Sequence, residues 1–337
     1  MNRRHAIRTL LATSCLTLSA AGVHAAQTYA IAGKIAGPDG GWDYASYDSG
    51  AHKIYVSRTD GVMSIDVATK AVTGHLLHGS KARAVVALPA LHRLLVTFGG
   101  DNATTIFDTE KSQVVATLPV PGSPDGAVLD PKTSDVYIMS KNGNVTVVDP
   151  AAARVKGHFT IGGELEAPAV DGQGKMFVNV ADKSEIAVVD LQSQRVTAHY
   201  HLAGCEGPTG LAFIPNGRRL ISVCDNGVAD IVDADTGKAV GTLKIGAGPD
   251  AVILDIQRQL ALVPSGDAGT LTVIDISSPQ GAIKQQLKTE PAAATGALEP
   301  ESGRLYLPTA NFPPGPPPEH RADHLPGTFH VLVVEPR

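Results

Sequence analysis

Acidic, amide and basic residues recur at the ends of short apolar runs, and they are the residues that could bind a ligand. The strongest candidates for a ligand site are Trp42, Asp43, Arg58, Arg83, Asp125, Asn142, Asp225, Asp250 and Asn311. Lys141 and Glu166 belong to a wider set of the same kind. Carboxylates mixed with a few cations suit a polar ligand or a metal cation. The alternative for each residue is turn chemistry, in which the side chain bonds its own backbone.

Motifs of common catalytic and cofactor sites are missing from the sequence. There is no Gly-x-Ser-x-Gly elbow, no phosphate-binding loop and no Cys-x-x-Cys-His haem motif. His320 and His324 have the four-residue spacing of a metal-binding pair on a helix, but the prolines around them disfavour a helix. We therefore assign no catalytic residue, no cofactor and no metal ligand.

A repeated pattern must position the candidate residues. Each copy has an apolar strand, a tight polar turn and a second strand that closes on an acid. The closing acids are 42, 41, 41, 43 and 42 residues apart, and they are Asp66, Asp108, Asp149, Asp190, Asp233 and Asp275. A period near 40 residues with several short strands is typical of a β-propeller. We assign the closing acids to turns, where their carboxylates can accept bonds from free backbone amides.

The copies predict an all-β fold, a propeller of seven blades with four antiparallel strands each. The expected blades are 42–79, 82–122, 125–164, 167–205, 208–247, 250–290, and 294–337 together with 27–36. Segment 27–36 is a strand without a partner of its own, so we expect it to close the ring as the outer strand of the last blade.

This arrangement also predicts where the Pro-rich segment and the channel mouth of the propeller lie. The Pro-rich segment 311–327 is expected to be an extended loop inserted between the second and third strands of blade seven. Loops that join blades converge with loops that join second and third strands around one mouth of the channel. The candidate residues would share that mouth, where loops on a rigid scaffold commonly bind.

Residues 1–25 have the features of a secretory signal peptide. Arg3, Arg4 and Arg8 precede an apolar run over 10–23, and small residues end the segment. The arginine pair fits both the general and the twin-arginine export routes. The run is too short to span a bilayer, so we expect residues 26–337 to form a single periplasmic or secreted domain without a membrane span.

Cysteine use agrees with export. Cys205 and Cys224 are the only cysteines that follow the signal peptide, and the repeat places them near the same face of blade five. In an oxidising compartment we expect a disulfide between them. The alternative is a free pair with redox or metal activity, which no Cys-x-x-Cys motif supports.

The charge of the mature chain bears on its partners. The leader holds three of the 28 Lys and Arg residues and no acid, so 25 bases against 33 acids leave a net charge of −8. DNA and anionic membranes bind cationic surfaces, so nucleic acid is a poor candidate partner.

Particular stretches of the chain also carry a family resemblance. They are the Tyr-Val-Ser-like strand before Gly-Val-x-x-Ile-Asp, the segments 40–44 and 205–213, and the segment 306–310 before the Pro-rich loop. On these residues the mature chain resembles the YVTN-repeat β-propellers, and among them the secreted bacterial proteins called YncE-like. The resemblance implies fold and export but no particular reaction. Where relatives often carry a His-Gly pair opening the second blade, this chain has Ala82-Arg83-Ala84-Val85, which puts a ligand that depends on that histidine in doubt.

Together these features predict an exported, monomeric propeller that acts as a binding or interaction module. Its partner would be a small polar ligand or an envelope protein, bound at the channel mouth. One alternative is a metal-dependent hydrolase of the lactonase type, with metal ligands drawn from Asp43, Asp125, Asp225 and Asp250. A second alternative is a DNA-binding envelope protein, which rests on family analogy and conflicts with the net charge.

Overall fold

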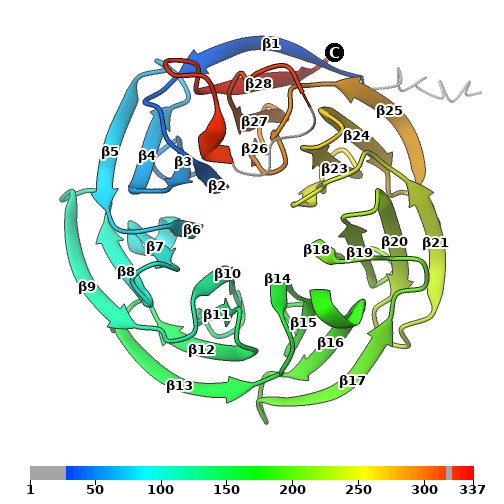
Figure 1. Cartoon of the computed structure of the whole chain (residues 1–337). Helices are drawn as coiled ribbons and strands as arrows, with labels where there is room; N and C mark the ends of the chain where they lie inside the picture. The colour runs from blue at the N-terminus through cyan, green and yellow to red at the C-terminus, as the bar shows by residue number, and fades with distance from the viewer. Residues whose placement is uncertain (1–27, 316–320) are drawn as a thin grey trace, which may run out of the picture.

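Seven four-stranded antiparallel sheets form a closed ring (Figure 1). The computed structural model describes residues 28–315 and 321–337. The predicted all-β propeller of seven blades is therefore confirmed, whereas the signal peptide expected over 1–25 lies outside the described residues. No helix in the described ranges is long and apolar enough to cross a membrane.

Six blades follow the chain from an innermost to an outermost strand. Blades one to three contain β2 (Trp42–Asp48), β3 (Lys53–Arg58), β4 (Gly61–Asp66), β5 (Val72–His78), β6 (Ala82–Leu88), β7 (Arg93–Phe98), β8 (Ala103–Asp108), β9 (Gln113–Pro119), β10 (Pro124–Leu129), β11 (Val136–Ser140), β12 (Asn144–Asp149) and β13 (Arg154–Thr160). Blades four to six contain β14 (Leu165–Val170), β15 (Lys175–Val180), β16 (Glu185–Asp190), β17 (Arg195–His201), β18 (Pro208–Ile214), β19 (Arg219–Cys224), β20 (Val228–Asp233), β21 (Ala239–Lys244), β22 (Ile253–Asp255), β23 (Leu260–Ser265), β24 (Thr270–Asp275) and β25 (Ala282–Lys288).

Blade seven is built from both ends of the described chain. Its strands are β26 (Ala297–Glu299), β27 (Arg304–Thr309), β28 (His330–Pro336) and, outermost, β1 (Tyr29–Ala36). β1 pairs antiparallel with β28 from Tyr29 opposite Pro336 to Ala36 opposite His330. The side chain of Tyr29 is buried, with 1% of the residue exposed. The predicted ring closure is therefore confirmed.

Some predicted blade boundaries were off by a few residues. Blade four begins at Leu165 rather than at residue 167, and the innermost strands of blades six and seven are only three residues long. In blade six, Pro249 forms only an isolated bridge to Ser265 before the ladder starts at Ile253. Proline cannot donate a ladder hydrogen bond, but β10 and β18 also begin with proline and are six and seven residues long, so proline alone does not shorten β22.

The hydrophobic core lies between neighbouring blades. Every residue of β19 is buried, whereas burial alternates along outer strands such as β13. This difference arises because a middle strand packs against a blade on each side, while an outer strand has one face in water. Ile54 and Met63 of blade one join Val331 of blade seven in one such cluster, so ring closure also completes the core.

Two local predictions about turns and cysteines are also confirmed. Asp66 accepts hydrogen bonds from the backbone amides of Ala68 and Thr69, and the other closing acids make equivalent bonds. Cys205, which precedes β18, forms a disulfide with Cys224 at the end of β19, with the two Cα atoms 5.5 Å apart.

Deleting residues 28–35 should abolish cooperative folding, because β28 would keep an unpaired edge and the core would lose Tyr29. Thermal unfolding followed by circular dichroism is the measurement. A matched truncation that removes only residues 1–27 should keep a sharp transition. A soluble 28–35 deletion with the full-length midpoint would show that β1 is not needed for closure.

Replacing both Cys205 and Cys224 with alanine should lower the free energy of unfolding by about 3 kcal/mol. The bond closes a loop of sequence separation 19, and a loop of that size restricts the unfolded chain by about this amount. Urea titrations with and without reductant give the measurement, and the double variant should be insensitive to reductant. An unchanged midpoint of the reduced wild-type protein would argue against the stabilising role.

Candidate functional site

The start of each innermost strand places one side chain at the channel mouth. In blades one to five, the strand register shifts just after the first residue, as between Trp42 and Ala45 or between Pro124 and Ala127. Such a bulge leaves the next residue outside the ladder and redirects its side chain. These redirected positions are held by Asp43, Arg83, Asp125, Glu166 and Thr209, and the matching position of blade six, after the bridged Pro249, is Asp250.

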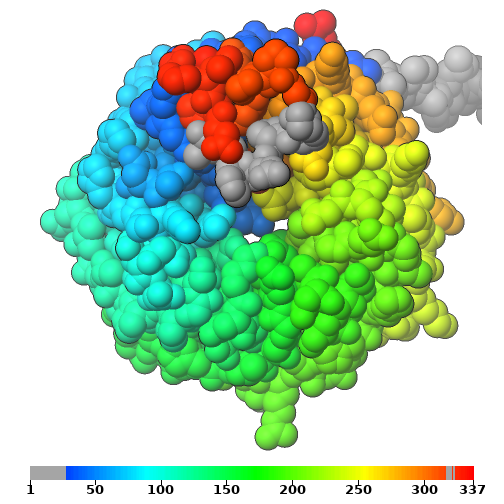
Figure 2. All heavy atoms as spheres, in the orientation of Figure 1, coloured from blue at the N-terminus to red at the C-terminus, as the bar shows by residue number. Residues whose placement is uncertain are grey.

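The ring of residues surrounds a cavity of about 410 Å³. All six ring residues line it, together with Trp42, Tyr44, Lys81, Lys141 and Arg321 among others. Figure 2 shows the face on which the cavity opens, with the orange and red segment of blade seven lying over part of the centre. The structure brings five of the candidate residues together around this cavity, namely Trp42, Asp43, Arg83, Asp125 and Asp250.

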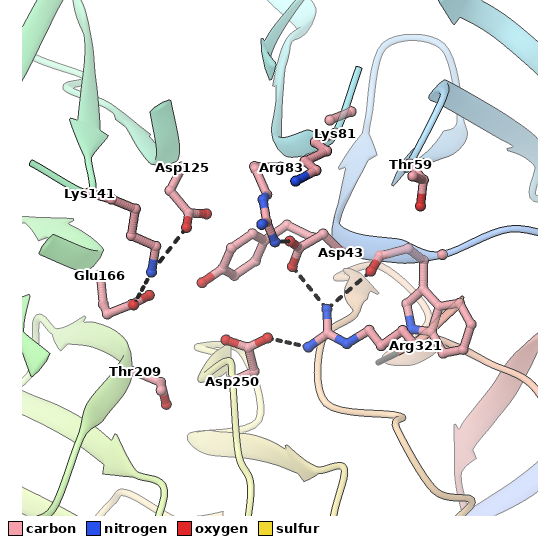
Figure 3. Close-up of a pocket in the computed structure, with 14 residues that line it drawn as sticks. Asp43, Thr59, Lys81, Arg83, Asp125, Lys141, Glu166, Thr209, Asp250 and Arg321 are labelled. Carbon is pink, nitrogen blue, oxygen red and sulfur yellow. Dashed lines mark hydrogen bonds and ion pairs between the residues drawn. The ribbon is translucent and has the colours of Figure 1, made fainter. Parts of the chain in front are cut away.

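One half of the mouth is organised by Arg321, as Figure 3 shows. Its Nη1 donates to Asp43 Oδ1 at 2.9 Å and to the Trp42 carbonyl at 3.2 Å, and its Nη2 pairs with Asp250 Oδ2. Arg83 Nη1 donates to the other oxygen of Asp43 at 2.7 Å. Asp43 is only 6% exposed, and its two guanidinium partners offset the cost of burying its charge.

The other half is organised by Lys141, in the turn after β11. Its Nζ lies 3.2 Å from Asp125 Oδ2 and pairs closely with Glu166 Oε1. Glu164 is more distant, at 3.7 Å, and lies at the rim with half of its side chain exposed. The ammonium group of Lys141 therefore forms ion pairs with two carboxylates, those of Asp125 and Glu166.

Burial raises the pKa of two carboxyl groups at the mouth, those of Asp43 and Glu166. Burial, opposed by Arg321 and reinforced by Asp250 and Asp125, raises the pKa of Asp43 to about 6. Burial outweighs the attraction of Lys141 and raises the pKa of Glu166 to about 7. Such shifts are common at functional sites, although structural ion pairs also cause them.

Arg321 lies in the connection between β27 and β28, and contacts of this connection with blade one fix its position. It opens the short turn η3 (Arg321–Asp323). Three residues later, His324 accepts a hydrogen bond at Nε2 from the Gly40 amide, and its Nδ1 donates to the Leu325 carbonyl. Both ring nitrogens are thus used within the protein, and the connection is fastened to the start of blade one.

Aromatic packing supports the same connection. The Trp42 ring lies 5.3 Å from the Phe329 ring and 6.3 Å from the Phe312 ring, measured between centroids. Arg58 stacks 3.5 Å above Phe329 and donates to the carbonyls of Pro38 and Gly40. Arg58 is buried, and its hydrogen bonds are made within the protein. It therefore packs against the segments that carry the mouth and does not line the cavity.

The remaining candidates lie outside the main cavity. Asp225 lines a neighbouring cavity of about 480 Å³ that shares Thr209, Asp250 and Arg321 with the first. Burial and repulsion from Asp250 and Asp267 raise the pKa of Asp225 to about 6. Asn142 accepts a bond from the Asn144 amide within its turn, and Asn311 bonds Thr328 and Leu325 through its backbone.

The nine strongest candidates left out three charged groups that form the ion pairs at the mouth. Lys141 and Glu166 belonged to the wider set, whereas Arg321 was not singled out. The only signal for Arg321 was its place in a loop expected to lie near the mouth. In the described ranges, no group of three or more His, Cys, Asp or Glu side chains is arranged to hold a metal ion.

Glu166→Gln should change how stability depends on pH. The pKa of Glu166 in the folded protein, about 7, lies above its ordinary value of 4.5. The stability that its protonated form contributes is therefore complete below pH 4.5 and is lost as the pH rises through about 7. Relative to wild type, the melting temperature of the variant should rise between pH 5 and pH 8, by about 2 °C or more.

The matched control for that variant is Glu164→Gln, which removes the exposed acid beside the same lysine. Its melting temperature should stay parallel to that of wild type across this range. Parallel curves for Glu166→Gln itself would contradict the raised pKa.

Comparisons with known proteins identify the fold alone. No family model and no curated protein matches the chain. A solved structure of Kuenenia stuttgartiensis hydrazine synthase is similar with a TM-score of 0.70 and 15% identity, over 85% of this chain and 95% of that one. A chain of a mitotic checkpoint complex is similar with a TM-score of 0.76 and 12% identity, over 99% of both chains. At these identities the likeness shows that this chain shares the β-propeller fold with both.

Proposed function

We propose that the protein is an exported binding module whose channel mouth holds a small polar group. That group would be brought by a free molecule or by an envelope protein. The observation that carries the proposal is the ring of redirected side chains. Asp43, Arg83, Asp125, Glu166 and Asp250 occupy equivalent positions in different blades and converge on one cavity.

Unused hydrogen-bonding capacity supports binding over a purely structural role. Arg83 donates only to Asp43 among the described residues, so its Nε and Nη2 are available, and its side chain is 41% exposed. Lys81 lines the same cavity and forms no ion pair within the described ranges. These cationic groups line the cavity and are available to bind acceptors of a ligand.

Export is supported by the disulfide, because such bonds persist in oxidising compartments and are rare in a reducing cytosol. The basic and apolar leader over 1–25 points the same way. The YVTN-repeat resemblance of the strand and turn sequences is consistent with this assignment, and membership of that family remains part of the proposal.

The alternatives find less support at the mouth. A hydrolase would need the free carboxylates of Asp43, Asp125, Asp225 and Asp250 to converge on a metal. Instead, Asp43 and Asp250 pair with Arg321, Asp125 pairs with Lys141, and Asp225 lines a different cavity. DNA binding has no specific contact in its favour, and the net charge opposes it.

A thermal-shift screen of the purified protein tests the proposal. The panel holds amines, amino acids, sugar acids, nucleotides and divalent metal ions. A ligand at a hundred times its dissociation constant should stabilise the protein by about 2.7 kcal/mol. Asp125→Asn and Asp250→Asn should each weaken binding of the active compound by tenfold or more. The control Arg154→Ala removes an exposed cation of the outer strand β13 and should bind normally.

Other outcomes would favour the alternatives. Stoichiometric divalent metal that is lost in Asp125→Ala or Asp250→Ala would favour the hydrolase. Salt-sensitive retention on DNA would favour nucleic-acid binding. A compound that binds equally well to wild type and to both mouth variants would place its site elsewhere and refute the assignment.

A further inference from the structure

We propose that the mouth recognises a guanidinium group, that Arg321 occupies this site in the free protein, and that an arginine-like ligand takes its place. This inference rests on the proposed function and names the class of ligand. It concerns the side of the mouth where blade six, blade seven and blade one meet. For the ligand to bind, the Arg321 side chain must move away from Asp43 and Asp250.

Arg321 does not belong to the repeated pattern of the ring. Asp250 lies three residues before β22, and the residue three before β26 in blade seven is Ala294. Alanine brings no polar group, so blade seven leaves a gap in the ring of polar side chains. Arg321, from the connection between β27 and β28, lines the same cavity as Ala294.

The contacts of Arg321 describe a guanidinium-binding site. Its two terminal nitrogens reach carboxylates on different blades, Asp43 and Asp250, and one of them also donates to the Trp42 carbonyl. A planar cation with several donors matches acceptors spread in this way, whereas an ammonium group is a single point of charge. The site is therefore selective for shape as well as for charge.

An incoming cation would meet unpaired carboxylates first. Asp225 and Asp267 line the cavity beside Arg321, and neither forms an ion pair with any residue that the structure describes. They would attract a cation to the position where Arg321 can be exchanged. If Arg321 left without a substitute, Asp250 would lose its cationic partner, and leaving a partly buried charge unpaired is costly.

The buried indole of Trp42 adds a second indication. Trp42 lines the main cavity, and its Nε1 has no hydrogen-bond partner among the described residues. Buried donors are usually satisfied in native proteins. An arginine residue carries a backbone carbonyl several bonds from its guanidinium group, and this carbonyl could accept a hydrogen bond from the indole once Arg321 has moved.

The test is calorimetric titration with N-acetyl-arginine amide as the probe. Arg321→Ala should bind the probe at least tenfold more tightly than wild type, because the site is no longer occupied. The uncharged isostere N-acetyl-citrulline amide should not bind, and N-acetyl-lysine amide should bind at least tenfold more weakly. Adding Asp250→Asn to Arg321→Ala should remove binding, whereas Arg154→Ala should behave as wild type.

Displacement is measured directly in the wild-type protein. The Arg321 Nε–H signal, assigned by its loss in Arg321→Lys, should move toward the position of solvent-exposed arginines as probe is added. This measurement does not depend on whether Arg321→Ala folds.

Each contrary result has a distinct meaning. A folded Arg321→Ala that ignores the arginine probe, or a wild-type Arg321 signal unmoved by saturating probe, would overturn the inference. Equal affinity for the lysine probe would overturn recognition of a planar cation. If another compound still bound at the mouth and depended on Asp125 and Asp250, the proposed binding function would stand without this ligand class.

Discussion

Closure of the ring is the constraint on which the rest of the structure depends. A single four-stranded blade cannot bury its two faces, so each blade needs a neighbour on both sides. The pairing of β1 with β28 supplies the last neighbour and joins residues from the two ends of the described chain. The same closure brings blade seven beside blade one, so Arg321 can reach Asp43, 278 residues earlier. The pairing of β1 with β28 therefore completes the core and also brings together the residues of the mouth.

Much of the fold could be predicted because its signals are local and repeated. A closing acid such as Asp66 bonds the amides of its own turn, so its spacing records the length of a blade. The strand expected over residues 27–36 predicted closure, because it had no partner of its own and the last copy lacked an outer strand. The blade boundaries were harder to predict. The innermost strands β22 and β26 are only three residues long, and the repeat gives no local signal for where their ladders begin.

The candidate site could be predicted only where it follows the repeat. Asp43, Arg83, Asp125 and Asp250 recur at one register position, which the alignment of the copies reveals. Arg58 occupies the end of a second strand near the same face, but no pattern in the repeat indicates that its side chain stacks on Phe329. Arg321 lies in a segment without periodicity, so its reach could not be inferred from any neighbouring copy.

Ligand specificity in a propeller must come from differences between blades. If all seven blades carried the same residue at the ring position, the mouth would present only one kind of group. The side formed by blades two to four has its own cations, Arg83 and Lys141. The side formed by blades five to seven has Thr209, Asp250 and Ala294 at the ring, and its cation comes from the inserted connection. A buried carboxylate such as Asp43 requires compensating charge whether or not a ligand is present. Arg321 meets that requirement in the free protein, and because it is not part of the rigid ring, it is also the group that a similar cation could replace. The arrangement depends on the connection between β27 and β28 and on the carboxylates that face it.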